Sequence, residues 1–183
     1  MDKYEISPNG KAAIAYASKL NWSVFPLHTP NGKLCSCHNP NCQSVGKHPR
    51  TKNGLKAAST NLEVIREWWE KWPEANIAIA TGQESGFVVL DVDPRHGGEG
   101  SLDLLKNQYG SLPNTIEAIT GGGGRHILFK NPGQVKNKTN ILPGLDVRGE
   151  GGYIVVSPSL HACGKRYEGR AEHVRCFPCR VLA

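Results

Sequence analysis

Residues 87–94, FVVLDVDP, constrain the fold of this chain more than any other stretch, because a run of apolar residues ends there in two aspartates. The apolar run predicts a core strand, and successive side chains of a strand point to opposite faces of its sheet. Asp91 and Asp93 are therefore expected on one face, about 7 Å apart along the backbone. Pro94 ends the strand, and the glycines of residues 97–100 predict a loop beside it. This arrangement would leave both carboxylates at an accessible rim.

Two carboxylates at the end of a strand are suited to Mg²⁺ or Mn²⁺, because these hard cations prefer oxygen ligands. Ions held in this way can bridge the phosphates of a nucleotide triphosphate. The alternative is that Asp91 and Asp93 belong to a solvated turn, as isolated Asp-x-Asp sequences commonly do. The preceding apolar run favours the metal site, since it places the pair on a core strand.

Composition favours a soluble domain with a sizeable core. The chain has 183 residues, of which 38% are hydrophobic and 21% charged, which suits one domain in one or two lobes. No apolar run approaches the roughly 18 residues of a membrane span, and the N-terminus has no signal-peptide pattern. We therefore expect a cytoplasmic protein without a membrane partner. The net charge of +6 suits a polyanionic partner, although plain surfaces also carry such an excess.

A polar loop at about residues 33–50 carries the pattern of a zinc site. Three cysteines and one histidine are spaced as C-x-C-x4-C-x5-H: Cys35, Cys37, Cys42 and His48. Three thiolates with one imidazole suit four-coordinate Zn²⁺, and His38 is the competing nitrogen ligand. Clustered cysteines in a cytosolic chain favour metal over disulfides. We expect a structural zinc here, the alternative being a set of reduced, solvent-facing thiols.

Four cations lie within and just after this loop, namely Lys47, Arg50, Lys52 and Lys56. Interleaved with glycines, they can contact phosphates, although a solvated basic loop explains the spacing equally well. Near the C-terminus, Cys176 and Cys179 would need two further ligands to bind zinc, and Cys163 has no evident role.

The apolar periodicity of the chain predicts helices alternating with strands. Helices are expected at residues 11–20, 61–72 and 101–109, the second with Asn61 as its N-cap. Strands are expected at residues 22–27, 76–80, 116–120, 125–130, 145–149 and 153–157. Four consecutive glycines, residues 121–124, join two of these strands into a hairpin whose loop has no side chains. Such a loop lets a backbone or a ligand approach closely.

Further polar residues lie on the predicted strands. His126 follows the glycine loop, and a single histidine in such a position is commonly a structural residue. Asp146 and Arg148 share one face of the strand over residues 145–149. Both strands could therefore add polar groups to the site of Asp91 and Asp93.

The order of these motifs, over about residues 11–170, resembles the bifunctional primase-polymerase domain of the archaeo-eukaryotic primase superfamily. That family has an Asp-h-Asp strand, a Ser-x-His-type motif after a glycine-rich turn, and an h-Asp-h-Arg-Gly strand before Gly-Gly-Tyr. The matching residues here are Asp91 and Asp93, residues 124–126, and Asp146 ahead of residues 149–153. Gly124 takes the place of the serine of some relatives, so a backbone N–H would have to replace the hydroxyl contact to phosphate.

The resemblance implies an α+β fold, in which an RRM-like palm sheet packs beside a smaller α/β lobe. Residues 1–170 would form the catalytic domain, with the zinc-binding loop as an insertion, and residues 171–183 a tail that begins an accessory segment. Family members occur in plasmid, phage and integrated-element replication proteins, commonly ahead of a helicase. We expect this chain to extend primers but to start them poorly, because initiation needs additional binding surface.

The resemblance also implies the chemistry of the site. Asp91, Asp93 and Asp146 would hold two Mg²⁺ or Mn²⁺ ions for nucleotidyl transfer from a dNTP or NTP to a primer 3′-hydroxyl. His126 would be a further catalytic residue beside these acids. The triphosphate would be contacted by His126 and by further residues of the motifs and the basic loop, namely Arg125, Gly124, Arg148 and Lys47. Single-stranded DNA template would lie on the basic surface of residues 47–56.

Two other classes of function remain open at this stage. A nicking replication initiator needs a nucleophilic tyrosine and a cluster of histidines, but His126 and His161 have no adjacent partner histidine. A non-catalytic zinc-stabilised module that binds nucleic acid would explain the charge and the cysteines, but it would leave the three acids unexplained. A requirement for Mg²⁺ or Mn²⁺ in nucleotide binding would distinguish the enzyme from such a module.

Overall fold

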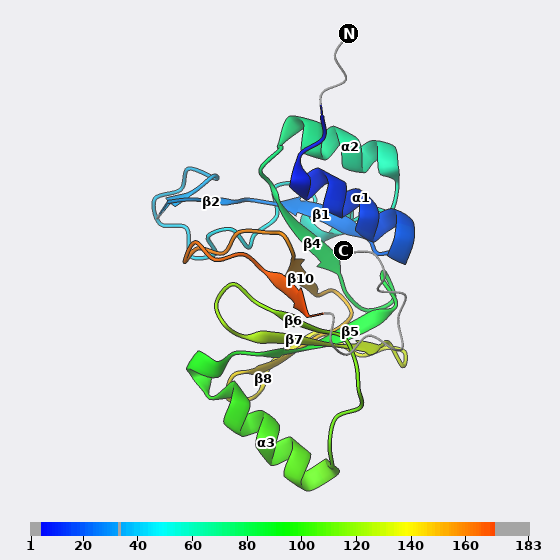
Figure 1. The fold of residues 1–183 in the computed structure, drawn as a ribbon, viewed down its shortest axis with the longest axis vertical. Helices are drawn as coiled ribbons and strands as arrows, with labels where there is room; N and C mark the ends of the chain where they lie inside the picture. Colours follow the sequence, from blue (N-terminus) through cyan, green and yellow to red (C-terminus); the bar gives the residue numbers. More distant parts are fainter. Residues whose placement is uncertain (1–4, 33, 171–183) are drawn as a thin grey trace.

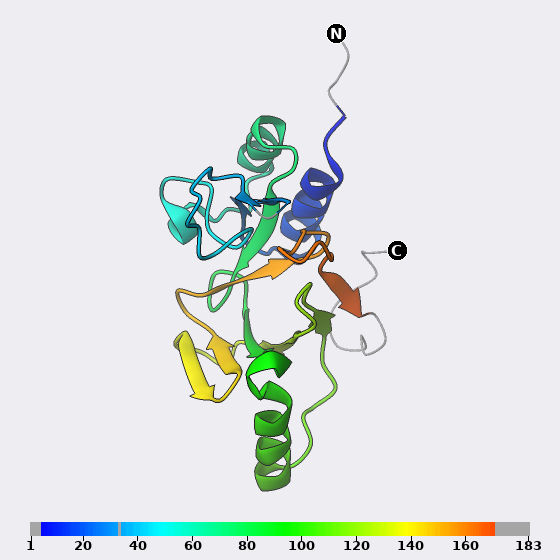
Figure 2. The same cartoon turned by 90° about the vertical axis from the view of Figure 1, so that its left-hand side faces the viewer.

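Two antiparallel sheets form the framework of the computed structural model, which describes residues 5–32 and 34–170 (Figure 1). The three-stranded sheet has the order β1 (Val24–Leu27), β4 (Asn76–Ala80), β10 (Tyr153–Val156). The six-stranded sheet has the order β11 (Glu168–Arg170), β6 (Glu117–Ile119), β7 (Arg125–Lys130), β5 (Phe87–Val92), β9 (Leu145–Arg148), β8 (Lys138–Leu142). A small hairpin of β2 (Pro30–Asn31) and β3 (Leu34–Cys35) begins the Cys-rich loop, which lies beside the three-stranded sheet (Figure 2).

Two helices cover one face of the three-stranded sheet. They are α1 (Pro8–Leu20) and α2 (Leu62–Lys71). The Ser7 side chain caps α1 by accepting a hydrogen bond from the backbone of Gly10, and the Asn61 side chain caps α2 in the same way. The predicted N-cap at Asn61 is therefore confirmed. Short 3-10 helices follow at η1 (Gly54–Ala57) and η2 (Pro94–His96).

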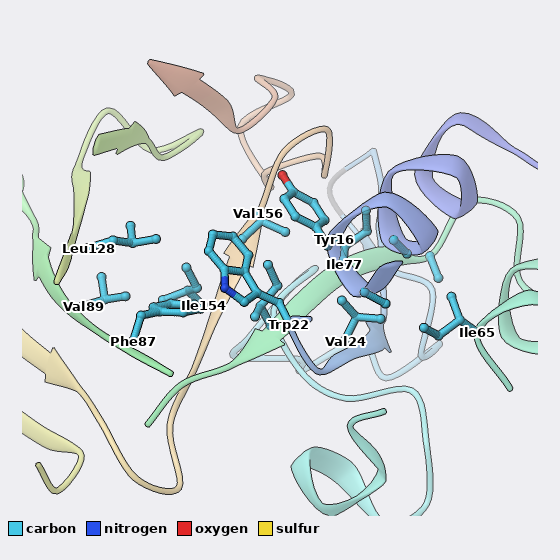
Figure 3. Packing of buried hydrophobic residues seen from close by; sticks show 14 of the residues in the cluster. Tyr16, Trp22, Val24, Ile65, Ile77, Phe87, Val89, Leu128, Ile154 and Val156 are labelled. Carbon is cyan, nitrogen blue, oxygen red and sulfur yellow. The ribbon is translucent and has the colours of Figure 1, made fainter. Parts of the chain in front are cut away.

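The two sheets share one hydrophobic core, in which Trp22 has a central position (Figure 3). The ring centroid of Trp22 lies 5.9 Å from that of Tyr16 on α1 and 4.7 Å from that of Phe87 on β5. Ile154 of β10 and Leu128 of β7 belong to the same buried cluster. One face of the six-stranded sheet is thereby fixed against the three-stranded sheet, and it is this face whose polar end forms the site described below.

The third helix, α3 (Gly98–Tyr109), covers the opposite face of the six-stranded sheet, at the far end of the molecule from α1 and α2 (Figure 1). Leu102 of α3 packs in a buried cluster with Val92, Ile127 and Leu145 from three adjacent strands. Because side chains alternate along a strand, Val92 and Ile127 point toward α3 while their neighbours Asp91 and His126 point away from it.

The mixed α+β class and most of the predicted elements are confirmed, but the loop expected at residues 97–100 is wrong. Gly98 is the first residue of α3 and is buried. A Cβ atom at this position would lie 2.5 Å from the carbonyl oxygen of Gly144 and 2.7 Å from that of Asp93. The glycine allows the helix to begin directly against the end of β5. The strands β2, β3, β8 and β11 were not expected from the sequence.

No helix within residues 5–32 and 34–170 combines the length and the apolar character that crossing a membrane would require. The tail over residues 171–183, with Cys176 and Cys179, lies outside the described residues.

Candidate active site

A cavity of about 1060 Å³ lies against residues of both sheets. Its lining includes Tyr153 and Val155 of β10 and the polar ends of β5, β7 and β9. Along β5, the side chains that face the three-stranded sheet are Phe87, Val89 and Asp91. The first two are buried in the shared core and the third lines the cavity. The same strand face thus changes from apolar packing to a carboxylate where the core ends.

Strand register brings three of the predicted site residues into one row. Asp91 of β5 is paired with His126 of β7 on one side and with Asp146 of β9 on the other. Residues opposite each other on neighbouring strands have Cβ atoms about 4.5–5.5 Å apart and point to the same face. The row therefore presents two carboxylates and an imidazole to the cavity, all three of which line it.

Arg148 lies beside this row and joins its two acids. Its Nη2 atom donates to Asp91 Oδ2 at 3.0 Å and to Asp146 Oδ2 at 2.6 Å. The three side chains are similarly accessible, at 24–26% of their surface. The backbone N–H of Asn140 on β8 donates to the other Asp146 oxygen at 2.7 Å. The single guanidinium group of Arg148 therefore balances part of the negative charge of two neighbouring carboxylates.

Asp93 also lines the cavity, but it lies just beyond β5 and caps η2. Arg95 donates to both of its carboxylate oxygens, at 3.0 Å from Nε and 2.8 Å from Nη2. His96 Nδ1 lies 3.0 Å from Asp93 Oδ2. The hydrogen bonds from Arg95, with a further contribution from His96, hold the pKa of Asp93 well below its usual range. Asp93 is thus ionised and bound by its own loop.

His126 is buried, with 5% of its surface exposed. Its Nε2 atom lies 3.6 Å from Asp91 Oδ1. Burial lowers the pKa of the imidazole, and the attraction of Asp91 only partly offsets this effect. The ring of Tyr167 lies 6.3 Å from that of His126 and forms another part of the cavity lining. At neutral pH His126 is therefore an uncharged hydrogen-bonding group.

Lys47 reaches the same cavity from the Cys-rich loop. Desolvation lowers the pKa of its ammonium group, and the nearby charge of Arg95 lowers it further, while Asp91 and Asp93 act in the opposite direction. Lys47 and Arg148 thus place two positive charges beside the acids.

The glycine loop between β6 and β7 approaches the end of β5 closely. A Cβ atom at Gly124 would lie 2.5 Å from the carbonyl oxygen of Val92, so only glycine fits there without a shift of the backbone. The N–H of Gly124 donates to Thr120 Oγ1 at 2.9 Å. The backbone donor expected at Gly124 is therefore already engaged. Thr120, which the sequence did not single out, lines the cavity together with Gly124.

Arg125 lies on the other face of the six-stranded sheet and does not line the cavity. Its guanidinium donates to both carboxylate oxygens of Glu99 on α3, at 3.0 and 2.7 Å, and to Glu117 of β6 at 3.4 Å. The reason is strand alternation, because Arg125 and His126 are consecutive residues of β7 and must point to opposite faces. The structure thus separates Arg125 from the other residues predicted to contact a triphosphate.

Comparison with protein families gives a match that covers residues 13–179. The matching family is described as "Bifunctional DNA primase/polymerase, N-terminal". The chain belongs to this family. The resemblance predicted from the sequence is thereby confirmed, and membership implies a nucleotidyltransferase of the primase/polymerase type with nucleotide and nucleic-acid substrates. A search of curated proteins found no match.

The primase/polymerase domain also contains a compact cluster of metal-ligating side chains. One atom from each of its residues lies within 4.8 Å of the others, and the set is the predicted one: Cys35, Cys37, Cys42 and His48. Cys35 Sγ lies 3.3 Å from His48 Nε2. Burial alone would raise the pKa of Cys35, but hydrogen bonds from the backbone of Gly46 and Cys37 and from the His48 side chain lower it to about 6. A cluster of this composition could bind zinc, and His38 is not part of it.

Hydrogen bonds connect the segment of residues 46–48 to the body of the domain. The carbonyl of Gly46 accepts from the buried Asn76 side chain at 2.9 Å, that of Lys47 from the Tyr153 hydroxyl at 2.9 Å, and that of His48 from the backbone of His28 at 2.9 Å. One segment therefore carries both a residue of the cysteine cluster and a residue of the cavity.

Several cavity residues were not identified from the sequence. They are Arg95, His96, Thr120, Asn137, Thr139, Asn140 and Tyr167. The sequence could have indicated Arg95 and His96, because they directly follow the Asp-x-Asp-Pro motif. No sequence pattern could have indicated Thr139 and Asn140, since β8 lacks the apolar alternation of a strand.

Proposed function

We propose that the domain catalyses template-directed nucleotidyl transfer, joining a dNTP or NTP to a 3′-hydroxyl with two divalent cations. The observation that carries this proposal is the row of Asp91, His126 and Asp146 on three adjacent strands. The row borders a cavity of about 1060 Å³, which is ample for a nucleotide. Family membership supports the same reaction class.

The acids fit Mg²⁺ or Mn²⁺ in their chemistry and in their convergence. Asp91 Oδ2 and Asp146 Oδ2 both lie within 3.0 Å of one nitrogen of Arg148, so both oxygens can reach a cation near that position. Asp93 is the third proposed ligand, and it would give up hydrogen bonds from Arg95 to bind a metal. Bound divalent cations would supply activation of the 3′-hydroxyl and neutralise charge on the α-phosphate and leaving pyrophosphate.

Donors along the cavity are proposed to hold the triphosphate. Lys47 and Arg148 supply positive charge, while the uncharged His126 supplies a hydrogen bond. Thr120 is proposed to supply the hydroxyl that Gly124 lacks, because Thr120 Oγ1 lies 2.9 Å from the Gly124 nitrogen and lines the cavity. The role of Gly124 is then to let the loop approach β5.

The six-stranded sheet is proposed to be an RRM-like palm, since it carries all three acids on or beside adjacent strands. Single-stranded template and primer are proposed to enter where Thr139 and Asn140 of β8 border the cavity. The exposed lysines Lys136 and Lys138 lie next to this border and can contact phosphates. We further propose a role in plasmid or phage DNA replication, together with a helicase.

The cysteine cluster is proposed to bind one structural Zn²⁺. The three thiols and the imidazole fit a closed tetrahedral site in number and type. The cluster lies in a loop with little apolar packing of its own, so a metal would stabilise the conformation of the loop directly.

Primer extension is the experiment that tests the proposed reaction. Labelled dNTP and NTP pools are supplied in parallel with a primed single-stranded template, with Mg²⁺, Mn²⁺ or a chelator. We expect extension that requires a divalent cation and is lost in Asp146→Asn. The matched control is Asp103→Asn, which removes an exposed carboxylate on α3 outside the cavity and should leave extension unchanged. Equal activity of Asp146→Asn and the wild type would refute the proposal.

A further inference from the structure

The position of Arg148 resembles that of a bridging cation. Its Nη2 atom alone contacts one oxygen from Asp91 and one from Asp146, at 3.0 and 2.6 Å. Arg148 Nε adds only a longer contact of 3.4 Å, to the same Asp91 oxygen. The guanidinium therefore does not form the usual fork with one carboxylate. One positively charged nitrogen lies between two acids of neighbouring strands.

We propose that Arg148 acts as a stand-in for the divalent cation and exchanges with it. In the metal-free protein the guanidinium holds Asp91 and Asp146 together. When a cation binds to these oxygens, Arg148 moves away and becomes a ligand of the nucleotide triphosphate. This inference rests on the proposed function, because it requires that Asp91 and Asp146 bind a divalent cation.

A divalent cation and the Arg148 guanidinium cannot both lie between Asp91 and Asp146, because of their size and their positive charge. The two oxygens that converge on Arg148 are those that would converge on a metal, and a cation there would lie within a few ångströms of the guanidinium. Two cations at such a distance repel each other strongly in a partly desolvated site. Without any cation, the two carboxylates would repel each other in the same way. Arg148 removes that repulsion until the metal arrives.

The surroundings of Arg148 allow the movement. Its side chain keeps 26% of its surface accessible, so it can rotate without opening the core. Its backbone stays in β9, where Arg148 is paired with Val89 of β5. The cavity beside it is lined by Lys47 and Tyr153, so a displaced guanidinium would remain in the space proposed for the triphosphate.

The exchange makes metal and nucleotide binding cooperative. A bound cation frees Arg148 for the phosphates, and a bound triphosphate holds Arg148 away from the acids. By thermodynamic linkage, each ligand then increases the affinity for the other. Removal of Arg148 should have opposite effects on the two ligands, which a merely structural arginine would not produce.

The experiment is a Mn²⁺ titration of the whole chain, followed by the electron paramagnetic resonance signal of free Mn²⁺, and a separate titration with a fluorescent dNTP at saturating Mn²⁺. Arg148→Gln should bind Mn²⁺ without nucleotide roughly 5- to 10-fold more tightly, because a competing positive charge is gone. The same variant should bind dNTP at least about 5-fold more weakly. Arg125→Gln is the matched control on the opposite sheet face, and both affinities should equal those of the wild type.

Wild-type protein gives a second measurement that does not depend on the folding of a variant. In a ¹⁵N spectrum of the arginine side chains, Mg²⁺ should shift the Nε–H signal of Arg148 and leave that of Arg125 in place. Unchanged or weaker Mn²⁺ binding by Arg148→Gln would overturn the exchange but not the proposed function. An Arg148 signal that does not shift when Mg²⁺ is added would do the same. A wild type that binds no divalent cation would overturn both the exchange and the proposed function.

Discussion

Loss of the proposed zinc should weaken nucleotide binding as well as the fold, because residues 46–48 connect the two sites. The perturbation is Cys42→Ser, which removes one of the clustered thiols. The segment is tied to the body by one hydrogen bond at each of three carbonyls, those of Gly46, Lys47 and His48. At a net contribution of about 1 kcal/mol for each bond, release of the segment would cost about 3 kcal/mol.

This cost corresponds to a decrease in Tm of roughly 6–12 °C, since a chain of this size loses about 2–4 °C for each kcal/mol. The effect on nucleotide affinity comes from Lys47, which follows the segment out of the cavity. Loss of one positive charge from a partly exposed phosphate site should weaken dNTP binding roughly 5- to 10-fold.

The assays are thermal unfolding, zinc analysis and titration with a fluorescent dNTP. Cys163→Ser is the control, because Cys163 lies outside the cluster and a serine hydroxyl can still donate to the carbonyl of Gly121. Lys47→Met separates the two effects, since it should weaken dNTP binding without loss of zinc. If Cys42→Ser loses zinc and stability but binds dNTP as the wild type does, the zinc-bound segment does not position Lys47 for nucleotide binding.

Three further predictions concern the cavity. Asp91→Ala should decrease single-nucleotide incorporation by at least about 10³-fold with little change in Tm, and activity above a tenth of the wild type would contradict its role as a metal ligand. His126→Ala should raise the KM for dNTP more than the Kd for template, measured at two template concentrations, and a selective loss of template binding would show the reverse role. Gly124→Ser should destabilise the domain by about 1–3 kcal/mol in chemical unfolding, because its Cβ would lie 2.5 Å from the Val92 carbonyl oxygen, and an unchanged midpoint would contradict the close approach.

The central row of the site could be predicted because it follows from strand periodicity and short motifs. Asp91 was expected at the polar end of a core strand, and its strand, with those of His126 and Asp146, was correctly located. Which strands are neighbours is a property of the tertiary fold, so the pairing of Asp91 with both residues required the structure. Arg125 was grouped with His126 because the two are adjacent in sequence. Consecutive residues of a strand point to opposite faces of the sheet, so Arg125 lies away from the cavity.

Other parts of the site depend on contacts between distant segments. Lys47 was visible as one of several cations in a basic loop, but only the hydrogen bonds of residues 46–48 to Asn76 and Tyr153 distinguish it from Lys52 or Lys56. The glycines near residue 98 suggested a loop because their usual effect is to destabilise helices. Gly98 instead begins a helix, where the close approach of Gly144 excludes any side chain.

Anomalous scattering of Mn²⁺, in crystals soaked with MnCl₂ and a non-hydrolysable dNTP analogue, would locate the cations directly relative to the carboxylates of the cavity. We expect a manganese peak in contact with both Asp91 and Asp146, with the triphosphate beside Lys47 and Arg148. A nucleotide bound elsewhere, or manganese peaks that avoid these two carboxylates, would contradict it.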